Sequence, residues 1–255
     1  MNVAIVYFTY ERDAELLGLS LQAVDRLRAA GDNVSVYVFD DASAPLAEVP
    51  AGVVYEQTSF ERKGNLNGLE CIDGMLALYE RVFAETGADW LVKQDCDTFM
   101  NDLDWLRDKD VERVGQVGSK QVNDFCSGAC YALSRAGVAA VRERLEDAAM
   151  RKRAGKAWCE DSIIGRVLET TELHIEWLGS IYNEPKVGVL YHDWMNDGEA
   201  GMELLAVPFA VDFKRCCWNS VPENYEKDRE FALARMREYV EFWKQGREID
   251  NEQQN

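Results

Sequence analysis

The stretch Trp90–Asn101, WLVKQDCDTFMN, decides how the rest of the chain is interpreted. Its apolar start predicts a short buried strand over 89–94. Asp95 and Asp97 follow at the end of that strand, with one residue between them. Residues two apart in a strand share a face, so the two carboxylates can converge on one hard cation such as Mg²⁺ or Mn²⁺. Two aspartates that only cap a turn would give the same pattern, and the stretch alone leaves both interpretations open.

The residues before this stretch alternate between strand-like and helix-like segments. Strands are predicted over 2–8, 34–39 and 52–57, and helices over 13–31 and 69–87. Short strands that alternate with helices predict an α/β fold, with a mostly parallel central sheet and helices on both faces. Ligands of such sheets bind beyond the carboxyl ends of the strands, which is where Asp95 and Asp97 fall.

The second half of the chain is less regular. We expect strands over 128–134 and 186–194, helices over 135–155 and 160–169, and a charged amphipathic packing helix over 223–248.

Composition narrows the classes of partner. The chain has 255 residues and a formal net charge of −18, which argues against a nucleic-acid groove or an anionic membrane surface as the main partner. An anionic ligand in a local basic or metal-bearing pocket remains compatible with that charge. We expect no transmembrane segment, and the start MNVAIVYFTYERD predicts the first strand of a cytoplasmic protein. The seven cysteines lack zinc-like spacing and are expected to be mostly reduced, buried thiols.

Three motifs in order carry a resemblance to a known family. LVKQDCDTFMN, CSGACYALSRAGVAAV and CEDSIIG resemble successive motifs of family 31 glycosyltransferases, the beta-1,3-galactosyltransferase and Fringe-like enzymes, over about residues 89–169. Over about 1–75, the segments TYERDAELLGLSLQAV, VFDDAS and ERKGNLNG are similar to family 2 glycosyltransferases. The resemblance implies a GT-A fold over a single catalytic domain, 1–222, with a nucleotide-binding half (1–100) and an acceptor half (101–222). The remaining 223–255 is expected to form a C-terminal helix and tail.

The resemblance also implies an activity. Such an enzyme moves a sugar, of the galactose or N-acetylglucosamine type, from a UDP-sugar to a hydroxyl of a glycan acceptor, with inversion. Expelling a diphosphate needs charge stabilisation, which a divalent cation (Mn²⁺ or Mg²⁺) supplies. In the resembled families the residue matching Asp97 ligates the metal, and the residue matching Asp95 contacts the ribose or the metal shell. His192 would complete the shell or be a partly buried structural histidine. Asp193 beside it could orient the ring.

By the same resemblance Asp161 would be the general base, with Glu160 as the alternative. Read from the residues alone, two acids at that point could simply favour a helix N-terminus. Trp158, just before them, would stack on a sugar or belong to the core.

The nucleotide contacts are expected at the ends of the first two strands. By the resemblance to family 2, Asp41 would accept from the uracil N3–H, and Thr9 and Tyr10 would flank the base and ribose. Arg62 or Lys63 would meet the diphosphate or lie in a solvated loop.

Other classes of protein fit less well. A pyrophosphorylase or a dinucleotide dehydrogenase needs a glycine-rich loop after the first strand, and YFTYERD contains no glycine. The alternative that stays open is a non-catalytic sugar-nucleotide or glycan-binding protein on a GT-A scaffold.

Overall fold

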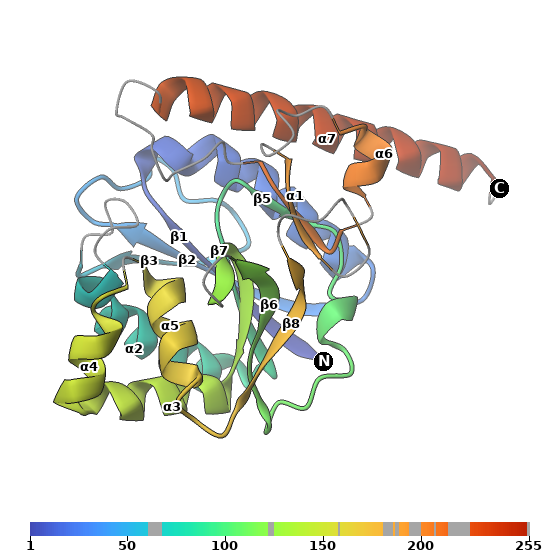
Figure 1. Ribbon diagram of the computed structural model, residues 1–255. Helices are drawn as coiled ribbons and strands as arrows, with labels where there is room; N and C mark the ends of the chain where they lie inside the picture. Colours follow the sequence, from blue (N-terminus) through green and yellow to red (C-terminus); the bar gives the residue numbers. More distant parts are fainter. Residues whose placement is uncertain are drawn as a thin grey trace.

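Two sheets and their covering helices make up the protein, here described from a computed structural model (Figure 1). The structure describes residues 1–60, 68–121, 125–157, 159–180, 186, 189–193, 200–206, 208–213 and 225–253. The large sheet has seven strands in the order β3-β2-β1-β4-β7-β6-β8. Their bounds are β1 Asn2–Thr9, β2 Asn33–Asp41, β3 Val54–Thr58, β4 Trp90–Gln94, β6 Val114–Gln121, β7 Phe125–Ser134 and β8 His174–Ser180. Only β7 runs antiparallel to its neighbours, so the expected mostly parallel sheet is confirmed.

Each face of the large sheet is covered by helices, which confirms the predicted α/β class. Alternate residues of a buried strand point to opposite faces, and β1 feeds two separate hydrophobic cores through Ile5 and Val6. One core contains residues of α1 (Ala14–Ala29) and α7 (Tyr225–Gln253). The other core contains residues of α2 Gly68–Thr86, α3 Arg135–Glu146, α4 Ala148–Ala154 and α5 Glu160–Leu168.

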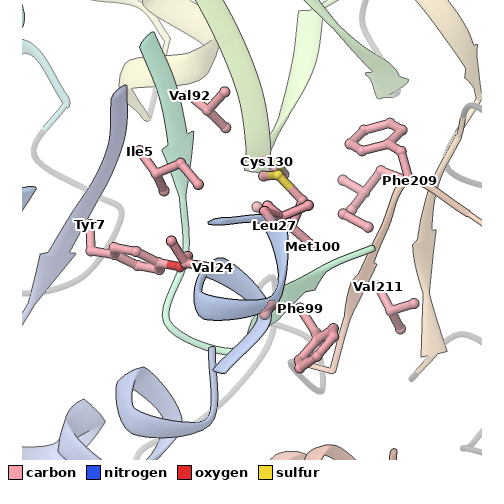
Figure 2. Close-up of a cluster of buried hydrophobic side chains, with 14 of the residues drawn as sticks. Ile5, Tyr7, Val24, Leu27, Val92, Phe99, Met100, Cys130, Phe209 and Val211 are labelled. Carbon is pink, nitrogen blue, oxygen red and sulfur yellow. The ribbon is translucent and has the colours of Figure 1, made fainter. Parts of the chain in front are cut away.

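A small three-stranded sheet lies beside the end of β4. Its order is β5-β10-β9, with bounds β5 Thr98–Met100, β10 Ala210–Asp212 and β9 Leu190–His192. Figure 2 shows Phe99, Phe209 and Val211 from this sheet region in the same cluster as side chains of β1, β4 and α1. The small sheet therefore shares the core beneath α1, and it ties late parts of the chain to the turn that follows β4.

The long helix α7 lies along α1 (Figure 1). Arg12 forms an ion pair with Glu226 at 3.4 Å, Arg237 pairs with Glu15, and Arg26 lies over the ring of Trp243. The buried side chains of α7, Ala232, Leu233, Met236, Tyr239 and Val240, belong to the core under α1. The expected packing role of this segment agrees with these contacts. Within the described residues, no helix combines the length and apolar character that crossing a membrane requires.

Several elements differ from the sequence-based expectations. The helix expected over 135–155 is two helices, because the backbone at Asp147 is extended and its side chain accepts a hydrogen bond from the Ala149 N–H at 2.8 Å. Strand β6 and the small sheet were not expected, whereas the alternation in ELHIEW agrees with β8, and β6 and β8 complete the large sheet beyond β7. Part of the strand expected over 186–194 lies outside the described residues, which leaves β9. Short 3₁₀ turns form at Glu11–Asp13 and Asp104–Leu106.

Gly137 offers a test of how α3 packs on the sheet. A Cβ at this position would lie 2.1 Å from the backbone oxygen of Gly115 in β6, whereas a Cβ at Gly18 in α1 would meet nothing within 4 Å. We expect Gly137→Ala to lower the free energy of unfolding in urea by at least about 2 kcal/mol, because backbone must shift. Gly18→Ala is the matched control and should raise it by about 0.5–1 kcal/mol. Equal effects of the two substitutions would contradict the packing of α3.

Candidate active site

The strands β2, β1 and β4 end at one edge of the large sheet because they are parallel neighbours. Thr9 at the end of β1 pairs with Asp40 in β2, and Tyr7 pairs with Gln94, the last residue of β4. Thr9 is buried, whereas Tyr10 beyond it is 41% exposed. The first two strands and the aspartate turn after β4 therefore present their polar ends at the same edge.

The two aspartates that end β2 hold the loop that follows. Asp41 Oδ1 accepts hydrogen bonds from the backbone N–H and the hydroxyl of Ser43, at 2.8 and 2.7 Å. Asp40 Oδ2 accepts from the Leu46 N–H and the Tyr55 hydroxyl, both at 2.7 Å. Asp41, predicted to contact the base, thus also shapes its own turn. Arg62 and Lys63, predicted to meet the diphosphate, lie outside the described residues.

The turn after β4 separates the two aspartates from the residue between them. Cys96 is buried and its thiol donates to the β1 backbone at 3.6 Å, while Asp95 and Asp97 are only partly buried. The backbone N–H of Asp95 donates to the backbone oxygen of Ala129 at 2.8 Å, and the backbone N–H of Phe213 donates to the backbone oxygen of Asp97 at 3.0 Å. Backbone bonds to β7 and to the end of β10 therefore fix the turn from two sides.

A buried polar network lies beneath this turn. Ser20 Oγ on α1 and the Gln94 side-chain amide both donate to the Thr98 oxygen, at 2.6 and 2.8 Å. Tyr7 shares a 2.9 Å hydrogen bond with Ser20 Oγ. Because buried hydrogen bonds are costly to break, this network makes the base of the turn rigid.

Lys93 is a buried cation that joins the turn to α5. Its Nζ lies 2.5 Å from Asp95 Oδ1 and 3.5 Å from Glu160 Oε1, and it donates to the Gly128 oxygen. The lysine is 1% exposed, so its charge depends on these partners. Removing one partner of a buried pair costs about 3–5 kcal/mol, so this ammonium fixes Asp95 and Glu160 relative to each other.

Glu160 and Asp161 open α5, and both are buried. Asp161 Oδ1 accepts from the Ser162 N–H at 2.6 Å. Its other oxygen, Oδ2, lies where a Cβ on Gly128 would be only 2.6 Å away. A glycine in β7 is therefore what allows the Asp161 carboxylate to sit against the strand.

Burial changes the chemistry of Asp161. Its pKa is raised to about 6, first because burial penalises the charged carboxylate and second because Glu160 carries a like charge. Lys93 and the Ser162 N–H act in the opposite direction. A carboxylate with a pKa near neutrality is suited to take up a proton, and such shifts gather at functional sites.

His192 in β9 lies across the small sheet from the aspartate turn. In register, His192 pairs with Asp212, and Asp212 pairs with Thr98. The His192 Nδ1 contacts Asp212 Oδ2, and its Nε2 lies 3.3 Å from Ser127 Oγ. A carboxylate on one ring nitrogen fixes the orientation of the imidazole, as it does for many metal-binding histidines.

Asp193 does not orient His192, contrary to one sequence expectation. Its two carboxylate oxygens accept from Arg235 Nε and Nη2 of α7, at 2.7 and 3.1 Å. Neighbouring residues of an extended segment point to opposite sides, so Asp193 faces the long helix while Asp212 takes the orienting role. The Asp193–Arg235 pair instead anchors α7 to the strand that carries His192.

The donor set fits a hard divalent cation in its chemistry. Carboxylate oxygens suit Mg²⁺ and Mn²⁺, and an imidazole held by a carboxylate suits a metal shell. Asp95, Asp97 and His192 all lie at the junction of the two sheets. Throughout the part of the chain that the structure describes, however, no three His, Cys, Asp or Glu side chains are gathered tightly enough to hold an ion. Asp95 contacts Lys93 and His192 contacts Ser127 instead.

The start of β7 contacts the histidine, the buried lysine, the candidate base and the aspartate turn of this site. Ser127 contacts His192, Gly128 contacts Lys93 and leaves room for Asp161, and the Ala129 oxygen accepts from the Asp95 N–H. Lys93, Ser127 and Gly128 fall within the motifs that resemble family 31, and no role was predicted for them. A lysine inside an otherwise apolar strand was the available signal. Asp212 is distant in sequence from His192, and no sequence pattern indicated that the two side chains meet. Trp158 lies outside the described residues.

Comparisons with known proteins bear on the fold. No protein-family model matches the chain, and no curated protein sequence is similar to it. Among solved structures, the galactosyltransferase LgtC in complex with donor and acceptor sugar analogs aligns with a TM-score of 0.54 and 11% identity, over 93% of this chain and 95% of that chain. An active-site mutant of LgtC aligns with a TM-score of 0.53 and 9% identity over the same shares.

A third solved structure, the apo form of the bifunctional glycosyltransferase WbbM, aligns with a TM-score of 0.53 and 12% identity. The alignment covers 94% of this chain and 49% of WbbM, so the chain spans about half of that protein. Identities this low are informative about the fold alone. The chain has the GT-A fold of these glycosyltransferases, as its sequence predicts.

Proposed function

We propose that this protein is a metal-dependent glycosyltransferase. It transfers a sugar, of the galactose or N-acetylglucosamine type, from a UDP-sugar to a hydroxyl of a glycan acceptor, with inversion. The observation that carries the proposal is the buried acid Asp161, with its pKa of about 6, joined through Gly128 and Lys93 to Asp95 at the carboxyl edge of a GT-A sheet. The three motifs similar to family 31 all contribute residues to that arrangement.

The donor would bind across the ends of β1, β2 and β4. Ligands of open α/β sheets bind at this edge. Thr9 and Tyr10 would flank the base and ribose, Asp41 would accept from the uracil N3–H, and Arg62 or Lys63 would meet the diphosphate. Asp95 would contact the ribose or the metal shell.

The metal, Mn²⁺ or Mg²⁺, would be held by Asp97, Asp95 and His192. When bound, such an ion neutralises negative charge that develops on the departing diphosphate. Asp212 would keep the His192 ring oriented, and the turn that carries Asp97 is fixed by the Phe213 N–H. An ion would also let an acidic chain hold an anionic donor.

Asp161 would act as the general base. Its carboxylate would accept the proton of the acceptor hydroxyl as that oxygen bonds to the anomeric carbon of the donor sugar. The bond from that carbon to the diphosphate oxygen breaks in the same displacement, and UDP leaves with the electron pair. One such displacement inverts the anomeric configuration. Glu160, whose carboxylate forms an ion pair with Lys93 at 3.5 Å, is the alternative base.

A second candidate function is a non-catalytic sugar-nucleotide or glycan-binding protein. The observation in its favour is that the described residues assemble no three-ligand group for a metal. Release of UDP from a panel of UDP-sugars, with and without Mn²⁺, separates the two. Metal-dependent release supports the transferase, and tight binding without turnover for every donor and acceptor supports the binding protein.

Asp161→Asn should abolish transfer and leave UDP-sugar binding intact, measured by calorimetric titration with UDP. The pKa of Asp161 is raised, so its charge opposes folding above pH 6. The variant should therefore be more stable than the wild type at pH 8, by about 1–3 kcal/mol in urea unfolding, and should lose this advantage below pH 4. Transfer at a near wild-type rate would show that Asp161 is not the base.

The pH dependence of kcat/KM should report the same group. A base with a pKa of about 6 must be deprotonated, so the rate should fall about tenfold for each pH unit below 6. Glu160→Gln removes the like charge that raises the pKa of Asp161, so it should move this limb to lower pH. Loss of all activity in Glu160→Gln, with Asp161→Asn still active, would make Glu160 the base instead.

Mn²⁺ binding, measured by electron paramagnetic resonance without substrate, tests the ligands. Asp97→Asn and His192→Ala should each weaken the affinity about tenfold or more, because each removes one donor. His174→Ala is the matched control: His174 is the other of the two histidines and is exposed on β8. An unchanged titration in His192→Ala would remove His192 from the metal shell.

A further inference from the structure

We infer that the acceptor carries an anionic group, a carboxylate or a phosphate, and that Lys152, Arg153 and Lys156 bind it. This inference rests on the proposed function, because it takes the side of the site next to Asp161 as the acceptor side. Lys152 and Arg153 lie in the last turn of α4, and Lys156 lies in the segment that joins α4 to α5, just before the candidate base.

The segment 151–156 has an unusual charge for this chain. The protein has 46 acidic and 28 basic residues, yet RKRAGK contains four cations and no acid. Arg151 is bound to Asp73 through two hydrogen bonds, at 3.0 and 2.5 Å. Lys152, Arg153 and Lys156 are exposed, and within the described part of the chain their side chains have no hydrogen bond, ion pair or ring contact.

The backbone that carries these cations is fixed in place. Ala154 and Ala157 are buried in the core beneath α2, α3 and α5. At Gly155 the chain turns so close to α2 that a Cβ would lie 2.5 Å from Leu69 Cδ2. The backbone between the end of α4 and Ala157 is therefore packed against the core and α2.

That turn leads into α5, whose first residue reaches the rest of the site through Lys93. The carboxyl end of α4 and the start of α5 lie side by side in Figure 1. Glu160 at the start of α5 lies 3.5 Å from Lys93 Nζ, and the same ammonium also contacts Asp95 in the aspartate turn. Lys156 precedes Asp161 by five residues, so their Cα atoms lie within about 18 Å of each other.

Helix stability explains only part of this cluster. Cations in the last turn of a helix stabilise its dipole, which accounts for Lys152 and Arg153 on α4. Lys156 lies beyond the helix and gains little from it. The net charge of −18 repels anions, so an anionic acceptor needs local cations to approach the site. A neutral acceptor has no such need, and the planar guanidinium of Arg153 suits a carboxylate or a phosphate.

The test compares matched acceptors and matched variants. The acceptors are synthetic glycosides, each prepared as the neutral sugar, as its uronic acid and as its phosphate monoester. The variant is the triple substitution Lys152→Gln, Arg153→Gln and Lys156→Gln. The control is the triple substitution Arg113→Gln, Lys227→Gln and Lys244→Gln, which changes the net charge by the same amount. Arg113 lies just before β6, and the two lysines lie on α7. Thermal unfolding checks that both variants fold.

We expect the charged glycosides to be preferred about tenfold in kcat/KM over the neutral ones, with the preference reduced by high salt. The triple variant should lose this preference, and the control should keep it. Donor KM and acceptor-free UDP release should be unchanged in both. Equal use of neutral and charged acceptors by the wild type, or a preference that survives in the triple variant, overturns the inference.

Two further outcomes are informative. Vesicles of phosphatidylcholine with phosphatidylglycerol test a membrane surface as the alternative source of anionic groups. If the triple variant loses vesicle binding while transfer to soluble charged glycosides is unaffected, the cations serve a membrane and the inference is wrong. If the wild type releases no UDP from any donor, the proposed function fails and the inference falls with it. Normal UDP release without a charge preference overturns the inference alone.

Discussion

The buried ammonium of Lys93 is the interaction on which the candidate site depends. It lies between Asp95, Glu160 and the Gly128 oxygen, so one charge connects the turn after β4, the start of β7 and the start of α5. A lysine in the middle of a sheet is costly unless it is paired. The acids around it are therefore required by the fold as well as by any chemistry, and the lysine prevents them from repelling one another.

The start of β7 positions the side chains around this ammonium. Ser127, Gly128 and Ala129 reach His192, Asp161 and Asp95 in turn, because successive residues of a strand point to alternate sides while their backbone groups bond along the sheet. The absence of a side chain at Gly128 matters as much as the presence of its neighbours. It lets the Asp161 carboxylate approach the strand and become buried, and that burial is the main cause of its raised pKa.

The small sheet and α7 hold the other side of the site. Asn101, just after β5, donates to the Leu205 and Pro208 oxygens and accepts from the Tyr239 hydroxyl of α7. Arg235, on the same helix, binds Asp193 next to His192. The last helix of the chain thereby supports both the strand after the aspartate turn and the strand that carries the histidine.

The sequence by itself determined the α/β class, the alternation of the first half and the position of Asp95 and Asp97 at a strand end, because these depend on local periodicity and on where an apolar run stops. It also placed Glu160 and Asp161 at a helix start. Only the tertiary structure decided that Asp212, and not Asp193, orients His192, that α3 and α4 are separate, and that Lys93 joins Asp95 to Glu160. The partners of His192 and Lys93 arise from strand register and burial between residues 20 to 70 positions apart, as His192 with Asp212, Ser127 with His192 and Lys93 with Glu160 illustrate, whereas the break between α3 and α4 is a local cap at Asp147. Local sequence pattern carries no information about such partners, nor about the desolvation that sets the pKa of Asp161.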